Sequence, residues 1–435
     1  MGTTKIHHLI VAIDDRLTQQ LHEIMQHPAL QELQATWTGL HYLVTQVKKT
    51  EPVKISILNV SWQTLCKDMH RSSDVEHSAL FDKINNLEFG MPGGEPFALI
   101  IGDYQLDINS VTNRHCVRDM QALKAMAQIS AMSFTLFVSG IKATAFGFET
   151  YRQFSGQGHL SIDATAINQT LWQRFRQSEE ARFIGLVLPR FLLNQHYQRV
   201  VQISRCYYGA PNYIWGNAVY AYAAVFARSF VETGWFLDAL GMPNDKMPSQ
   251  GGLLPNISAP PFIEDETILP DNLLTKVIIS DQQEQALNNA GFTVLSQLAQ
   301  IPWACFIHSP SLKSCGKQEG LLTAEQLSCL LPYLLCICRF AHYLKIIGRD
   351  KLGQYKDNKT CERELQTWLN QYIASNTDIT TAMKARFPLT AGDVKIMLQP
   401  GHEAHYICSM RLSPQLKTQQ TSASVLLKTA LTPIH

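Results

Sequence analysis

The amino-acid sequence predicts a mixed α/β protein, in which a helix-covered mixed sheet is followed by a C-terminal region with a long helix and a hairpin. Uniformly apolar runs at 97–101 and 134–138 are typical of strands buried on both faces. An amphipathic helical pattern through 117–126 separates them, and this strand–helix–strand order favours a parallel or mixed sheet. Apolar residues then alternate on both sides of Pro400-Gly401, which indicates a hairpin near the C-terminus.

The N-terminal elements follow from the spacing of apolar side chains. Residues 14–47 show helical spacing with a break near Pro28. Residues 53–57 alternate between apolar and polar, as a half-buried strand does. Ser61 is positioned to cap a short helix after that strand.

The middle of the chain predicts two more strands and one strong helix. The strands are 182–188 and 275–279, and the helix covers 215–230. Residues 241–273 are rich in Pro, Gly, Asn and Asp, so they read as a long surface excursion. Ser280 and Gln283 match a capping box, which places a helix start directly after the second strand.

The C-terminal region predicts a long helix through 331–353 that starts at the capping-box pattern of Thr323 and Gln326, so Pro332, one to two turns in, is expected to kink it. The hairpin strands are 394–398 and 406–412, and 421–432 is a candidate third strand. Because an isolated hairpin is marginally stable, it needs further strands. A chain of 435 residues is expected to form two or three domains. We predict an N-terminal helical segment at 1–50, a central α/β domain at 51–320 and a C-terminal domain at 321–435.

Composition narrows the class of protein. Charged residues make up 17% of the chain, below the roughly 25% usual in soluble domains, so we expect partners to cover much of its surface. A net charge of +1 gives no sign of attraction to nucleic acid or membranes. The ten cysteines lack a CxxC spacing and fit a reducing cytoplasm. The apolar runs are shorter than the roughly 20 residues of a membrane span.

Catalytic and metal motifs receive little support. The Gly90–Gly94 loop precedes a strand, whereas a phosphate-binding loop follows one. His402 and His405 are three residues apart in a predicted hairpin connection, while the zinc motif HExxH needs four on a helix. His7-His8 has no third ligand nearby, and no GxSxG elbow is present. We therefore predict no enzyme, cofactor or metal, and the alternative is a cytoplasmic α/β enzyme using the Gly90–Gly94 loop.

The predicted long helix carries four basic side chains three or four residues apart, Arg339, His342, Lys345 and Arg349, which therefore share one stripe. Two interpretations are open. The stripe is either an ordinary solvated face or a rail for an acidic partner surface, since charged stripes steer and register partners.

Many short segments, in order along nearly the whole chain, resemble the large subunit of the type VI secretion contractile sheath (the TssC/VipB family). They are residues 37–44, 57–60, 88–90, 93–96, 101–104, 181–186, 189–190, 215–218, 227–230, 280–281, 339–345, 349–351, 368–369 and 371–372.

The resemblance implies a structural protein of the bacterial cytoplasm that pairs with a small sheath subunit (TssB/VipA type). Such heterodimers, with further copies of the same chain, stack on a baseplate into a helical sheath around an Hcp tube and contract to propel it. The basic stripe would then face the tube. The C-terminal strands would join strands of neighbouring subunits through Val394, Ile396, Leu398, Tyr406, Cys408, Met410 and Leu412. A sheath-like paralogue without contractile assembly is the alternative within this family.

The sequence also departs from the family pattern. Family members carry an N-terminal helix that a AAA+ ATPase grips to recycle contracted sheaths, and this helix is expected to be missing or moved here. Gln282 and Gln283 stand where two arginines are common. Gly348 replaces an apolar residue, which costs about 1 kcal/mol of helix stability relative to Ala.

Overall fold

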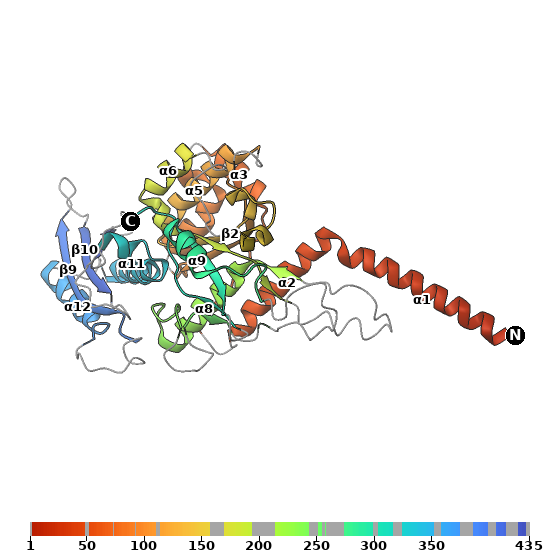
Figure 1. Ribbon diagram of the computed structural model, residues 1–435. Coiled ribbons are helices and arrows are strands. Elements are labelled where there is room, and N and C mark those ends of the chain that lie inside the picture. Colours follow the sequence, from red (N-terminus) through yellow and green to blue (C-terminus); the bar gives the residue numbers. More distant parts are fainter. Residues whose placement is uncertain are drawn as a thin grey trace.

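The computed structural model (Figure 1) describes these parts of the chain: residues 2–47, 52–72, 74–91, 93–109, 114–156, 169–193, 214–242, 251–254, 257, 274–298, 303–315, 324–351, 358–374, 386–398, 406–414 and 425–431.

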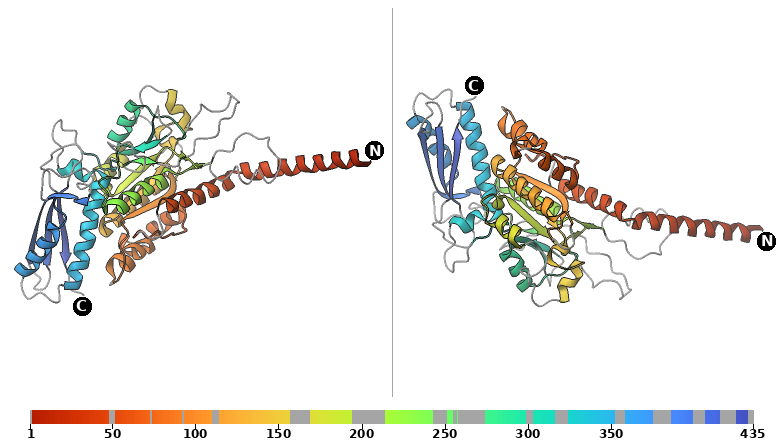
Figure 2. Two further views of the ribbon diagram at one scale, coloured as in Figure 1. Left: turned by 90° about the horizontal axis from the view of Figure 1, so that it is seen from below. Right: turned by 90° about the horizontal axis from the view of Figure 1, so that it is seen from above.

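Two helices open the chain, α1 (Gly2–Gln26) and α2 (Pro28–Gln46). They are separated at His27, whose extended backbone and side chain cap α2 while Pro28 occupies its first turn. The break near Pro28 is therefore confirmed, but the helix before it begins at residue 2 and not at residue 14. Helix α1 projects away from the rest of the molecule in every view (Figures 1 and 2).

The central sheet has six strands in the order β1-β2-β3-β7-β8-β6. Its first four strands are parallel, and the last two are antiparallel to their neighbours, which confirms the predicted mixed sheet. The strand bounds are β1 Leu99–Leu106, β2 Leu136–Ile141, β3 Ile184–Leu188, β6 Leu253–Leu254, β7 Phe292–Gln297 and β8 Ala304–Phe306.

Helices cover both faces of this sheet (Figure 2). Successive side chains of a strand point to opposite faces, so Phe137 of β2 joins one hydrophobic core and Val138 joins the other. The first core includes α3 (Trp62–Arg71), α5 (Cys116–Ser133), α6 (Gln169–Gln177) and α9 (Asp281–Asn289). The second includes α2, α8 (Ala218–Thr233) and α11 (Leu331–Lys351). The capping box of Ser280 and Gln283 is present at the start of α9, as predicted.

Short elements connect these layers. They are η1 Val75–His77, α4 Ala79–Phe81, the π-helical η2 Asp82–Gly90, η3 Ala143–Phe146, η4 Tyr151–Gly156, η5 Glu180–Phe183, and the strand pair β4 Phe191–Leu192 with β5 Trp215–Gly216.

A polar clamp holds α2 on the body. The carboxylate of Asp103, in β1, accepts hydrogen bonds from Thr36 Oγ1 (2.5 Å), Tyr220 OH (2.9 Å) and Asn217 Nδ2 (3.1 Å). One turn further along α2, the backbone of Gly39 lies against the Tyr220 ring, where an added Cβ would be 2.5 Å from the nearest ring carbon. Helix α2 is therefore held by two adjacent contacts on one face, and it carries α1.

The C-terminal region adds α10 (Ala324–Ser328), α12 (Asn358–Asn370) and a three-stranded antiparallel sheet. Its strands are β9 (Leu389–Leu398), β10 (Tyr406–Pro414) and β11 (Val425–Leu431), with β10 in the centre. The predicted hairpin and third strand are thus confirmed. Helix α11 lies between this sheet and the central one (Figure 2), and one continuous core joins them.

Several expected elements differ. Residues 53–57 form no helix or strand, and residues 275–279 make only the single bridge of Thr275 with Phe191. Residues 253–254, expected in a surface excursion, form the buried strand β6. Pro332 lies in the first turn of α11, so it begins the helix and does not kink it.

Candidate assembly surfaces

Those basic side chains of α11 that the structure describes do not form a free stripe. Arg339 is half-buried, and its guanidinium lies over the rings of Phe230 (4.3 Å to the centroid) and Tyr343 (5.0 Å). It also donates a hydrogen bond to the Tyr343 hydroxyl. Such cation–π contacts hold the charge against the helix's own neighbours.

His342 is a correction to the predicted stripe, because it is buried with 7% of its surface exposed. Its Nε2 lies 3.0 Å from the carbonyl oxygen of Ser133, and its ring packs edge-on against Phe89 at 5.4 Å. Burial, aided by the nearby Arg339 and Lys345 charges, lowers the pKa of His342 to about 4. It is therefore neutral at pH 7 and cannot touch a partner surface while the chain keeps this fold.

Lys345 is the remaining member whose side chain the structure describes. It is partly exposed, and its Nζ lies 3.5 Å from the centroid of the Phe89 ring. The side chain of Arg349 lies outside the described residues. Contact with a tube therefore stays a prediction, and Lys345 and Arg339 are the described side chains that can reach a surface.

The residues predicted to join neighbouring subunits first build the chain's own sheet. Val394, Cys408, Met410 and Leu412 are buried, at no more than 2% exposure each, and share the core of α11 and α12. Ile396 packs against the same core. The side chains of Leu398 and Tyr406 lie outside the described residues, although their backbones are paired with each other. For the five members whose side chains are described, any contribution to a neighbour must therefore come from the strand edges and not from the inward side chains.

The two edges of this sheet differ. Helix α12 covers the β9 edge: Val394 N donates to Gln366 Oε1 (3.0 Å), Gln366 Nε2 donates to Gly392 O (2.9 Å) and Ile396 N donates to Glu362 Oε2 (3.3 Å). At the opposite edge, β11 pairs with β10 alone among the described strands. Side chains of α12 therefore form hydrogen bonds with the main chain at the β9 edge. The β11 edge keeps main-chain groups with which a further strand can pair.

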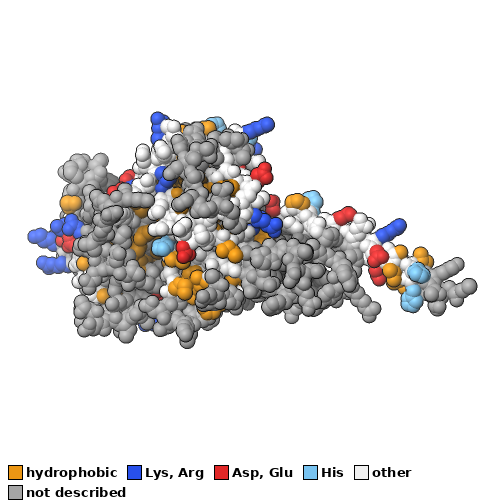
Figure 3. All heavy atoms as spheres, viewed as in Figure 1, with side chains coloured by type: hydrophobic (Ala, Val, Ile, Leu, Met, Phe, Trp, Pro, Cys, Tyr) orange, Lys and Arg blue, Asp and Glu red, His pale blue; other side chains and the backbone are white. Residues whose placement is uncertain are grey.

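Helix α1 exposes an apolar face over most of its length. The exposed fractions are 58% for Ile6, 48% for Ile10, 56% for Ile13, 57% for Leu17 and 58% for Ile24. Their spacing of three or four residues, apart from the step from Leu17 to Ile24, places them on one side of the helix. Figure 3 shows hydrophobic side chains along this projecting segment. An apolar face of this length on an isolated helix is typical of a surface that another protein covers.

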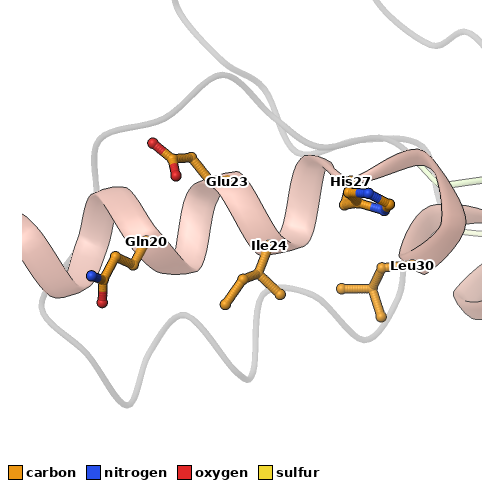
Figure 4. A pocket seen from close by; sticks show the side chains of 5 residues that line it. All are labelled: Gln20, Glu23, Ile24, His27 and Leu30. Carbon is orange, nitrogen blue, oxygen red and sulfur yellow. The ribbon is translucent and has the colours of Figure 1, made fainter.

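A shallow pocket lies where α1 meets α2 (Figure 4). Gln20, Glu23, Ile24, His27 and Leu30 line it. The ring of His27 is engaged by the backbone N–H of Ala29 at 3.3 Å. Among the described residues, the lining offers the Glu23 carboxylate and the His27 imidazole, and the imidazole already caps α2, so the pocket marks the junction of the two helices.

Glu88 packs against the end of the Gly90–Gly94 loop. The Glu88 carboxylate accepts the backbone N–H of Glu95 at 3.0 Å, and a Cβ on Gly94 would lie 2.2 Å from Glu88 O. The Glu95 N–H and the space beside Gly94 are thus already taken by Glu88 oxygens and are not open to a phosphate, which argues against the enzyme interpretation. His402 and His405 lie outside the described residues. Within the described residues, no three His, Cys, Asp or Glu side chains gather as metal ligands.

The cysteines bring one unexpected pairing. Cys315 and Cys329 form a disulfide across a separation of 14 residues, which no motif signalled and which differs from the free thiols expected in a reducing cytoplasm. Burial raises the pKa of the Cys336 and Cys408 thiols to about 12, so these two thiols behave as apolar core groups. Among the described residues, no helix has both the length and the apolar character needed to cross a bilayer.

Comparison with known proteins gives a consistent result. The EvpB/VC_A0108 tail sheath N-terminal domain matches residues 7–313, and the EvpB/VC_A0108 tail sheath gpW/gp25-like domain matches residues 322–431. The type VI secretion system sheath protein TssC1 of Pseudomonas aeruginosa is 31% identical over 439 residues, covering 98% of this chain and 86% of that protein.

Two solved structures show a weaker likeness. One is the sheath tail protein from Desulfitobacterium hafniense, with a TM-score of 0.32 and 9% identity over 72% of this chain and 60% of that one. The other is a chain of the anti-feeding prophage baseplate, with a TM-score of 0.35 and 10% identity over 71% of this chain and 65% of that one. This chain spans less than two thirds of either structure.

Proposed function

The chain belongs to the type VI secretion tail sheath family, and we propose that it is the large subunit of a contractile sheath. The observation that carries this proposal is that two tail sheath models account for residues 7–313 and 322–431 in order. The sheath would assemble in the bacterial cytoplasm from heterodimers with a small sheath subunit of the TssB/VipA type. It would surround an Hcp tube on a baseplate and propel the tube by contracting. No catalytic role is proposed.

The small subunit is the partner that we assign to α1. The exposed side chains Ile10, Ile13 and Leu17 offer an apolar seam that a partner helix can pack against. Leu17→Glu is expected to weaken co-purification of the small subunit by at least about tenfold, since a buried charge costs well over 1.4 kcal/mol. The matched variant Gln19→Glu, on exposed α1 surface, is expected to keep binding. Equal binding by both variants would remove α1 from the interface.

A neighbouring subunit is expected to add its strand at β11, because α12 occupies the β9 edge. In an antiparallel strand successive N–H groups point to opposite edges. One of the two variants Leu426→Pro and Leu427→Pro therefore loses an N–H that bonds to β10. The other loses only an N–H that points away from the sheet. The variant that keeps the folded chain's thermal unfolding temperature is expected to lose sheath formation. Normal sheaths from that variant would exclude the β11 edge.

Contact with the tube is proposed for Lys345. Lys345→Glu reverses a charge that is partly exposed, whereas Arg339→Glu would also place a carboxylate among aromatic rings and disturb the fold. Lys395→Glu, an exposed charge reversal on β9, is the matched control. If Lys345→Glu sheaths assemble around the tube as efficiently as Lys395→Glu sheaths, the proposed contact between α11 and the tube is refuted. Contraction itself would be a switch between two packed lattices of these contacts.

The proposal is tested by co-expressing the chain with its small subunit and purifying through a tag on the small subunit alone. The expected result is co-purification at equal stoichiometry in particles far larger than one heterodimer. A chain that stays monomeric and does not bind the small subunit would overturn the proposal. A soluble heterodimer that never polymerises would instead identify a sheath-like paralogue.

A further inference from the structure

Arg190 and Lys276 lie directly opposite each other on two neighbouring segments of the chain. The antiparallel bridge between Phe191 and Thr275 sets the register of this pair. One residue further along, Lys276 N donates a hydrogen bond to Arg190 O at 2.8 Å. Phe191 and Thr275 are both buried, and neighbouring side chains of an extended segment point to opposite faces. The side chains of Arg190 and Lys276 therefore share the other face, with their Cβ atoms about 5 Å apart.

These two positive charges have no negative counterpart of their own. In the part of the chain that the structure describes, no carboxylate lies within ion-pair distance of Arg190 or Lys276, although both side chains are half-buried. Burial, together with the positive charges of Arg190 and Arg152, lowers the pKa of Lys276. Like charges directly opposite each other destabilise a strand pair. The fold thus maintains a cationic group whose cost an external anion would remove.

The cationic group lies where parallel strands of the central sheet end. Arg190 follows Leu188, the last residue of β3, by two residues. Tyr151, next to Arg152 in η4, donates a hydrogen bond to the carbonyl oxygen of Ile141, the last residue of β2. Open α/β sheets bind their ligands outside the carboxyl ends of such strands. The position as well as the charge therefore favours a binding site.

The chemistry of this site favours carboxylates over phosphate. Phosphate sites commonly use backbone N–H groups at the start of a helix. The start of α9, shortly after Lys276, is closed by its capping box and carries Asp281 and Glu284 in its first turn. The N–H of Lys276 is itself bonded to Arg190 O. Recognition must then come from the side chains, and a guanidinium fork beside an ammonium group suits a pair of carboxylates.

We propose that Arg190 and Lys276, reinforced by the charge of Arg152, bind carboxylate side chains of an acidic segment in a partner protein. Alternate side chains of an extended segment lie about 7 Å apart on one face, so acidic residues two positions apart can reach both cations. The inference goes beyond the sheath role and does not depend on it, because it rests on the register and charges of this chain alone.

Fluorescence anisotropy tests the inference with the full chain and a labelled peptide. The peptide has about ten residues, the length of a long strand, with Glu at alternate positions, and a second peptide has Gln in their place. Arg190→Gln combined with Lys276→Gln is expected to weaken binding of the Glu peptide at least about tenfold. Lys67→Gln combined with Lys124→Gln removes the same charge at exposed sites of α3 and α5, and is expected to bind like the unmodified chain. Equal binding by the two double variants, or equal binding of the Gln peptide, would overturn the inference.

Two further measurements separate the acidic segment from other sources of negative charge. If inorganic phosphate displaces the peptide at an ionic strength at which chloride does not, the site belongs to a free anion and the inference is overturned. Lys276→Gln alone is expected to raise the thermal unfolding temperature of the free chain, because it removes one of two opposed like charges. A lower temperature would show that the chain supplies its own counter-charge, which would also overturn the inference.

Discussion

Replacing His342 by Phe should remove a large part of the chain's sensitivity to mild acid. The imidazole is 7% exposed, and burial is the main reason why its folded-state pKa is about 4, against an unfolded value of about 6.5. A group with a depressed folded pKa favours the folded state above the unfolded pKa. That contribution is lost as the pH falls, because the unfolded chain takes up the proton first.

The size of the effect follows from these two pKa values. The linkage relation gives a loss of about 2 kcal/mol of unfolding free energy between pH 7 and pH 5, and of about 3 kcal/mol by pH 4. A domain is typically stable by only about 5–15 kcal/mol, so this one side chain should dominate its response to mild acid.

The assay is urea unfolding at pH 7 and pH 5, followed by the fluorescence of the seven tryptophans. His342→Phe loses the contact with Ser133 O at both pH values, so that loss cancels when the two are subtracted. The unmodified chain should lose about 2 kcal/mol more than His342→Phe between these pH values. Equal losses would refute the conclusion that His342 is buried and neutral.

Three further predictions concern packing. Gly39→Ala should lower the unfolding free energy by about 1–3 kcal/mol, because its Cβ would lie 2.5 Å from the Tyr220 ring. Phe340→Ala should cost about 3–5 kcal/mol, since this side chain is 1% exposed and its ring stacks on that of Trp235. Cys315→Ser should cost about 3 kcal/mol in oxidising buffer by opening the loop that the disulfide with Cys329 closes, and almost nothing in reductant. Each is measured by urea unfolding.

Each of these has an internal control. Glu32→Ala, on the exposed side of α2, should leave stability nearly unchanged, and a destabilised control would attribute the Gly39 effect to α2 in general. Phe340→Leu should cost clearly less than Phe340→Ala, since a smaller cavity remains. A Cys315→Ser loss of equal size with and without reductant would show that the disulfide is not its cause.

Local patterns predicted the elements whose stability is local. Helix α5, the Ser280 capping box and the β9–β10 hairpin each depend on spacing or capping within a few residues, and the structure has them. Short strands have too few residues for an alternation of apolar and polar side chains to predict them. β6 has two residues and β8 has three, and both depend on pairing with distant segments.

The burial of His342 within the α11 stripe could not be predicted, for a different reason. Charges three or four residues apart show only that they share a helix face. They do not show that Phe89, Phe230 and Ser133, all distant in sequence, cover that face. Residues 53–57 show the converse: their alternation of apolar and polar side chains predicts a half-buried strand, yet they pair with no described strand.

Assembly of the sheath is the central claim, and negative-stain electron microscopy of pelleted lysate tests it most directly. The chain is co-expressed with the small subunit gene, and the pellet is compared with that of the chain expressed alone. The predicted result is hollow tubes with regular, cogwheel-like cross-sections that appear only when both subunits are present. Well-folded, soluble chain with no tubes in either sample would contradict the account.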